Sequence, residues 1–199
     1  MRLNMKGFFF CKSFISQDPD VEINPLSEIK DCLQENVQPM EYKELFSKLP
    51  HLPQNKIKFI LASNGEFINN GHGSYFHESC VKISDEELEN IADIIRYSIE
   101  EKEFISGNEL YDIIKAKYPY IVENNNFCSV HGFRDTLKYK MGDRFSFKGN
   151  IISCAGQKLS MSDIFANYAK KHNSFSLAEL QSLADELETT RIYFESVYD

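Results

Sequence analysis

The stretch Gly142–Ser153, GDRFSFKGNIIS, indicates how the chain is organised, because two similar strings occur earlier in the chain. Residues 7–16 read GFFFCKSFIS, and aligning the two strings at their shared Ile-Ser end superposes their aromatic residues. A third copy, GSYFHESCVKIS at 73–84, has one extra residue before its final Ile-Ser. Aromatic and β-branched residues around a short polar tip are typical of a β-hairpin. We therefore expect three related hairpins.

Helical patterns come before the hairpins in a constant order. Apolar residues at helical spacing predict helices near 25–34, 41–48 and 53–63, near 85–101, 107–117 and 128–140, and near 161–172, 177–187 and 189–198. Ser106-x-x-Glu109 and Ser176-x-x-Glu179 have the spacing of capping boxes, in which the serine and the glutamate satisfy each other's free backbone N–H groups. Each group of three helices is thus expected to form one structural unit.

The order of helices and hairpins divides the chain into repeats. A first repeat covers 25–84 and a second covers 85–153, each with three helices and a hairpin. Residues 1–24 contain a hairpin and a linker, and residues 154–199 contain helices without a hairpin. We therefore expect an α+β protein, mostly α, with an incomplete unit at each end. Either the chain is a segment of a longer array, or the two half-units complete each other within one molecule or between molecules, and the last case would give homo-oligomers.

Three helices followed by a hairpin within about 60 to 70 residues resemble the winged-helix branch of the helix-turn-helix superfamily. The resemblance covers nearly the whole chain and rests on the order of elements rather than on a diagnostic motif. It implies tandem winged-helix units. In a DNA-binding member, the third helix would enter the major groove and the hairpin, or wing, would contact the backbone or the minor groove.

Charge is distributed unevenly within the second repeat. Residues 85–112 hold ten acids and two bases, whereas residues 113–148 hold seven bases and three acids. Phosphate contacts need Lys or Arg, and reading bases needs Arg, Asn, Gln, Ser or His on the third helix. The expected DNA contacts of the second repeat are Ser129, His131, Arg134, Lys138, Lys140, Arg144 and Lys148. The first repeat offers Gln54, Asn55, Lys56 and Lys58.

The leading hypothesis is a regulatory or replication-linked protein that binds double-stranded DNA, mainly through the third helix and wing of the second repeat. The net charge of −8 and the pI near 5.2 favour an alternative, a protein-interaction scaffold that binds no nucleic acid. Its partner surface would be the acidic first helix of the second repeat or exposed aromatics, represented by Glu86, Glu89, Asp93, Tyr118 and Tyr120.

No catalytic signature occurs in the sequence, so we expect neither an enzyme nor a bound cofactor. The segment Asn70–Ser74, NGHGS, lies between two β-like runs and is typical of a hairpin tip rather than a phosphate loop. His72, His77 and Cys80 do not provide the four converging ligands of a zinc site. A wing that carries two exposed histidines explains them better, and no metal is expected.

The sequence also bears on the compartment. No run of about 18 to 20 apolar residues is present, so we expect no membrane-spanning segment. The apolar stretch at 7–16 is interrupted by Lys12, which argues against a signal peptide. The five cysteines are scattered and form no Cys-x-x-Cys pair, which favours free thiols in a reducing compartment. A cytoplasmic location is expected.

Overall fold

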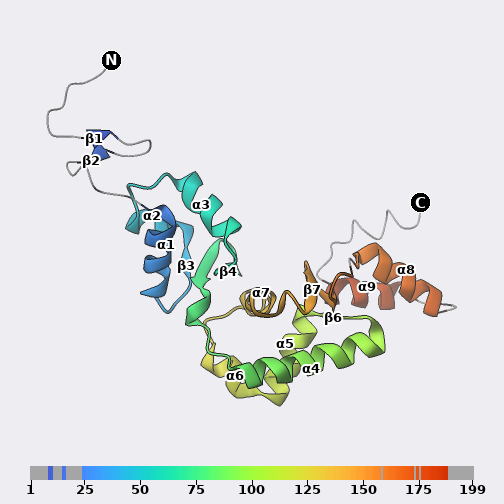
Figure 1. Ribbon diagram of the computed structural model, residues 1–199. Helices are drawn as coiled ribbons and strands as arrows, with labels where there is room; N and C mark the ends of the chain where they lie inside the picture. Colours follow the sequence, from blue (N-terminus) through green and yellow to red (C-terminus); the bar gives the residue numbers. More distant parts are fainter. Residues whose placement is uncertain are drawn as a thin grey trace. The chain divides into compact units, whose positions relative to one another are not determined.

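The computed structural model describes residues 9–10, 15–16, 24–157, 159–172, 174 and 176–187 (Figure 1). The chain divides into two compact units, Met1–Cys80 and Val81–Asp199, called the N-terminal and C-terminal units below. Strand β1 (Phe9–Phe10) pairs antiparallel with β2 (Ile15–Ser16), as expected for the first hairpin. The helix expected near 189–198 lies outside the described residues.

The N-terminal unit runs from helix to hairpin. Its elements are α1 (Pro25–Gln34), β3 (Met40–Glu41), α2 (Tyr42–Lys48), α3 (Gln54–Ser63), β4 (Phe67–Gly71), β5 (Ser74–His77) and a 3-10 turn, η1 (Glu78–Cys80). Helix α1 starts where Asn24 accepts backbone hydrogen bonds from Leu26 and Ser27, and Pro25 occupies the first helical position. The three helices bury one apolar face each against the sheet, around Ile29, Leu33, Leu45, Ile57, Leu61 and Phe67.

The C-terminal unit repeats this order and then continues. Its elements are α4 (Asp85–Lys102), β6 (Phe104–Ser106), α5 (Gly107–Lys117), α6 (Pro119–Asn124), α7 (Val130–Met141), β7 (Phe145–Lys148), β8 (Ile151–Cys154), α8 (Met161–Lys171) and α9 (Leu177–Glu186). Helices α8 and α9 bury Ile164, Phe165, Leu180 and Ala184 in one apolar cluster with Phe104 and Ile151 of the sheet. The helices expected to belong to a third repeat therefore share a core with the second.

Each unit contains a three-stranded antiparallel sheet, and the two sheets have the same order, β3-β5-β4 and β6-β8-β7. In both, a short strand before the second helix pairs with the last strand of the hairpin. Met40 lies opposite Tyr75 in one sheet, and Ile105 lies opposite Ile152 in the other. The sequence pattern did not reveal these added strands, because two or three extended residues are too short to show an alternation. It also missed helix α6, whose six residues are too few to show a helical repeat.

The expected fold class, α+β with mostly helix, is confirmed, and the predicted helices within the described residues lie within two residues of the observed ones. Capping boxes are present at Ser84, Ser160 and Ser176. The box expected at Ser106 is only half formed, because the Glu109 carboxylate accepts a hydrogen bond from Lys102 instead. No helix in the described part of the chain has both the length and the apolar character needed to cross a bilayer.

Candidate nucleic-acid interface

Helix α3 presents two different faces. Ile57 and Leu61 are fully buried and Ile60 is half-buried, so this side packs into the core of the N-terminal unit. Asn55 and Phe59 lie four residues apart on the opposite side, where residues one turn apart are neighbours. Both are exposed, and Phe59 keeps 70 % of its surface in solvent. The third helix of this unit therefore has a polar and aromatic surface that the core does not use.

Positive charge flanks the exposed side of α3. Lys56 and Lys58 are both exposed, and at about 100° per residue they lie on either side of the line from Asn55 to Phe59. Within the described residues neither lysine forms an ion pair with a carboxylate. Between residues 45 and 77 the only acid is Glu66, which is 2.8 Å from Lys30 Nζ and 3.3 Å from His77 Nε2. The α3 face is thus cationic although the protein is acidic.

Lys58 rests on aromatic rings of the preceding helix. The rings of Tyr42 and Phe46 lie nearly parallel, with centroids 5.9 Å apart, and the Lys58 ammonium is 5.4 Å and 5.8 Å from the two centroids. Cation–π attraction of this kind contributes about 0.5–1 kcal/mol at an exposed site. The contact holds Lys58 across the α2–α3 boundary but leaves its N–H groups able to bind an anion.

The hairpin β4–β5 of the N-terminal unit contacts Tyr42, one of the two rings beneath Lys58. The Tyr42 backbone N–H donates to the Gly73 carbonyl over 3.2 Å, and its hydroxyl is 3.1 Å from that of Tyr75. Gly73 has φ +76°, and a Cβ there would lie 2.8 Å from the Tyr42 ring. Only glycine fits both the backbone conformation and the close approach. The hairpin tip and helix α2 are therefore fixed relative to each other.

The two histidines of this hairpin have different environments. His72 at the tip is exposed, as expected, but His77 is 2 % exposed, so the expectation of two exposed histidines is wrong. His77 Nδ1 is 2.7 Å from the Ser79 hydroxyl, and Nε2 faces Glu66, which satisfies both ring nitrogens in the interior. Among the described residues, no group of three His, Cys, Asp or Glu side chains is arranged to hold a metal ion.

The corresponding helix of the C-terminal unit, α7, carries a carboxylate in the middle of its outer face. Asp135 Oδ2 is 3.6 Å from His131 Nε2, and Asp135 Oδ1 is 3.4 Å from Arg134 NH2. Ser129 is occupied as the helix N-cap, where its hydroxyl accepts from the Gly132 N–H over 2.9 Å. Three of the residues expected to contact DNA are therefore already engaged with neighbours on α7.

Both arginines expected to contact DNA are bound within the protein. Arg134 has an 11 % exposed side chain that packs against Gly107, where a Cβ would be 2.9 Å from its Cδ. Arg144 donates to both carboxylate oxygens of Glu89, over 2.6 Å and 2.8 Å. This hydrogen-bonded pair raises the pKa of Arg144 and lowers the pKa of Glu89. Of the remaining expected contacts, Lys138 and Lys148 are exposed and Lys140 is half-buried.

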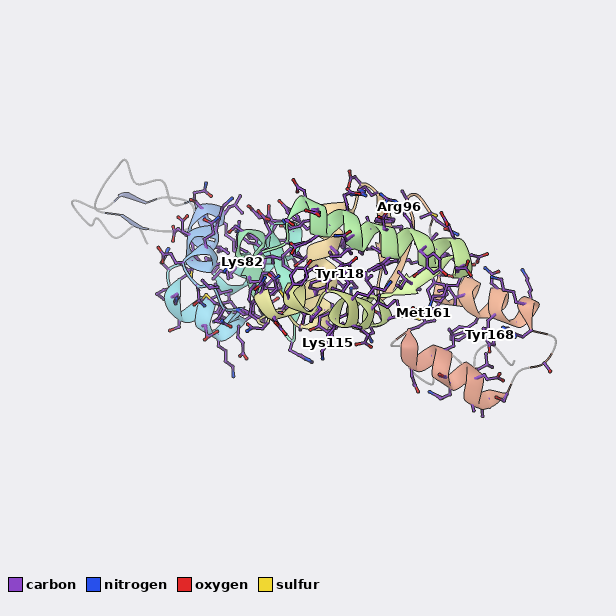
Figure 2. The ribbon with its side chains drawn as sticks, turned by 90° about the horizontal axis from the view of Figure 1, so that it is seen from below. Lys82, Arg96, Lys115, Tyr118, Met161 and Tyr168 are labelled. Atoms are coloured by element: carbon purple, nitrogen blue, oxygen red, sulfur yellow. The ribbon has the colours of Figure 1, made fainter. Side chains whose placement is uncertain are left out.

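An open groove of about 610 Å³ separates α4 from α5. It is lined by apolar, aromatic and charged side chains, among them Ile94, Tyr97, Glu101, Ile113 and Tyr118. Tyr97 is 67 % exposed, and Tyr118, labelled in Figure 2, follows the last residue of α5. Tyr118 was expected to be exposed but is half-buried beside this groove. Its ring contacts that of the exposed Tyr120 edge-on, with centroids 6.3 Å apart.

The sequence pattern ranked the basic half of the second repeat above the start of α3, whose Gln54, Asn55, Lys56 and Lys58 it also named. The missed signal was the near absence of acids between residues 45 and 77. Comparison of the chain with protein-family models, with curated proteins and with solved structures gave no match. The surfaces of α3 and α7, each taken within its own unit, therefore carry the functional information.

Proposed function

We propose that the protein binds double-stranded DNA through two winged-helix units, and that α3 of the N-terminal unit makes the main contact. Both units run from a helix through a short strand and further helices to a hairpin, with the extra short helix α6 in the C-terminal unit, and both sheets have the same strand order. These two features support the winged-helix interpretation. In that fold the third helix enters the major groove. The observation that carries the proposal is the outer face of α3, which has a lysine on either side and no carboxylate.

Assigning the main contact to α3 departs from the expectation drawn from sequence, which favoured α7 and its wing. The reason is electrostatic. For Arg144 to reach a phosphate, it would have to leave a bidentate pair with Glu89, and Asp135 would repel a phosphate approaching the outer face of α7. Lys56 and Lys58, by contrast, do not have to break an ion pair with a carboxylate in order to bind a phosphate. Lys138 and Lys148 then supply secondary contacts from the C-terminal unit.

The test is a fluorescence-anisotropy titration of a labelled random-sequence duplex at several salt concentrations between about 50 and 200 mM. Lys56→Ala/Lys58→Ala is compared with Lys138→Ala/Lys148→Ala, which removes the same charge from exposed positions of the other unit. We expect the first pair to weaken binding about tenfold or more at low salt, and the second pair to weaken it less.

The outcomes separate the two interfaces. A larger loss with Lys138→Ala/Lys148→Ala would move the main contact to α7, as the sequence pattern suggested. No binding of the wild-type protein at 50 mM salt would contradict the proposal as a whole. That result would favour the second candidate function, docking of a protein partner in the α4–α5 groove, where Tyr97 offers an exposed aromatic ring beside Asp93 and Glu101.

A further inference from the structure

The centre of the α3 face has a chemistry that goes beyond phosphate binding. Asn55 presents an amide and Phe59 presents an aromatic ring, one helical turn and about 6 Å apart along the axis. The other exposed residues on this side, Ala62 and Ser63, are small. Phe59 therefore projects beyond its neighbours and leaves 70 % of its surface in water, although Ile57 and Leu61 already fill the core side.

Resting on the DNA binding proposed above, we propose that Asn55 and Phe59 make this face selective for A·T base pairs. The Asn55 amide hydrogen-bonds N6 and N7 of an adenine, and the Phe59 ring covers the C5-methyl group of a nearby thymine. Both groups lie in the major groove, where an asparagine amide matches adenine and an apolar side chain matches the thymine methyl. The separation of about 6 Å places the two contacts within about two base-pair steps.

The positions of the lysines support DNA rather than a protein as the occupant of this face. Lys56 and Lys58 border the Asn55–Phe59 line on opposite sides, as phosphate strands border the two sides of a major groove. Protein–protein interfaces, by contrast, are depleted in lysine and cluster several large apolar residues around a hot spot. On this face Phe59 is the one large apolar side chain with a mostly exposed surface.

The closing experiment uses the full chain and three labelled duplexes of equal length. The first contains only A·T pairs, the second replaces every thymine of the first by deoxyuridine, and the third contains only G·C pairs. Deoxyuridine removes the C5-methyl group and leaves base pairing and the minor groove unchanged, so it isolates the contact assigned to Phe59. Phe59→Ala and Asn55→Ala are compared with Ser63→Ala, an exposed control on the same side of α3.

We expect the wild-type protein to bind the thymine duplex roughly three- to fivefold more tightly than the deoxyuridine duplex, the effect of burying about one methyl group. Phe59→Ala should remove this difference, and Ser63→Ala should keep it. Asn55→Ala should reduce the preference for A·T over G·C roughly five- to a hundredfold, the usual range for a bidentate base contact. Thermal unfolding of Phe59→Ala should match the wild type, because the ring is exposed.

The results distinguish failure of this inference from failure of the proposed function. Salt-dependent binding with equal affinity for the thymine and deoxyuridine duplexes would overturn the Phe59 assignment and leave DNA binding intact. An unchanged A·T preference in Asn55→Ala would overturn the Asn55 assignment in the same way. Failure to bind any of the three duplexes would contradict the proposed function, and with it this inference.

Discussion

Glu66 illustrates how one side chain couples a helix to the sheet of the N-terminal unit. Its Oε2 accepts a hydrogen bond from Lys30 Nζ of α1 over 2.8 Å and lies 3.3 Å from Nε2 of the buried His77. The Lys30 hydrogen bond, and secondarily the one to His77, lower the pKa of Glu66 below its ordinary value of 4.5. The charged carboxylate is therefore favoured in the folded state more than in the unfolded chain.

The lowered pKa predicts a pH-dependent contribution to stability. A carboxyl group with a depressed folded pKa stabilises the fold fully above the unfolded pKa and loses that effect as the pH falls through the folded pKa. We expect Glu66→Gln to lower the free energy of unfolding by about 0.5–1 kcal/mol at pH 7, a modest value because Lys30 is 39 % exposed. Below pH 4.5 the gap between variant and wild type should shrink.

Urea unfolding at pH 7 and at about pH 3 measures this gap. Glu35→Gln, an exposed carboxylate at the end of α1, is the control and should change stability equally little at both values. An equal gap between Glu66→Gln and the wild type at both pH values would contradict the assigned role of the Lys30–Glu66 pair.

At the scale of elements, α6 is tied to the segment that leads into α4 through a single buried side chain. Asn125, 1 % exposed, accepts from the Lys82 N–H over 2.7 Å through Oδ1, and its Nδ2 donates to the carbonyls of Lys82 and Ile121 over 2.9 Å and 2.8 Å. The amide thus replaces a strand partner for Lys82 and also completes the end of α6.

Loss of this amide should destabilise the C-terminal unit. Asn125→Ala leaves one backbone donor and two acceptors without their partner, so we expect the free energy of unfolding to fall by about 2–4 kcal/mol. Asn124→Ala is the matched control, because the adjacent asparagine is exposed and should be within about 0.5 kcal/mol of the wild type. Chemical denaturation followed by circular dichroism measures the free energy of unfolding of the two variants. Equal values for both would contradict the role assigned to Asn125.

At the scale of the whole molecule, acidic and basic side chains are concentrated in different segments of the chain. The net charge is −8, and the N-terminal unit has its acids mainly on α1 and around the start of α2, at Glu28, Asp31, Glu35, Glu41 and Glu44. The stretch from 45 to 77, which contains α3 and the hairpin strands, has three lysines and one acid. If the protein binds DNA as proposed, the electrostatic attraction is therefore local, and the acidic segments oppose it.

This distribution predicts a weak dependence of DNA affinity on salt. With roughly two to four phosphates neutralised, a plot of log K against log salt should have a slope of roughly −2 to −4, shallower than that of a strongly basic binder. Lys56→Ala/Lys58→Ala should reduce the slope by about 2. Anisotropy titrations at four or more salt concentrations measure the slope, and a value near −8 would show that more cations are involved than Lys56, Lys58, Lys138 and Lys148.

How far the candidate site could be predicted depended on whether each residue's partner is close in sequence. The polar residues at the start of α3 and Lys138 were found from local pattern, and they are exposed. Arg144 was expected to contact DNA because it is a cation, but its side chain is bound to Glu89, 55 residues away in the sequence. Asp135 and Glu89 were visible in the sequence, yet counting bases could not reveal which acid would face which arginine.

The amino-acid sequence by itself determined most of the helices, their caps and the hairpin tips, because helical periodicity, Ser-x-x-Glu spacing and turn residues act over only a few positions. The expectation that 73–84 forms a hairpin was wrong, because Ser74–His77 is the second strand of a hairpin that begins at Phe67, and Glu78–Cys80 is a 3-10 turn. Tertiary structure decided the rest. Strands β3 and β6 exist because distant hairpins supply their hydrogen bonds, and His77 is buried because Glu66 and Ser79 satisfy its ring. Tertiary structure also decided which cations are paired, since Arg144 is bound to the distant Glu89, whereas Lys56 and Lys58 of α3 form no ion pair within the described residues.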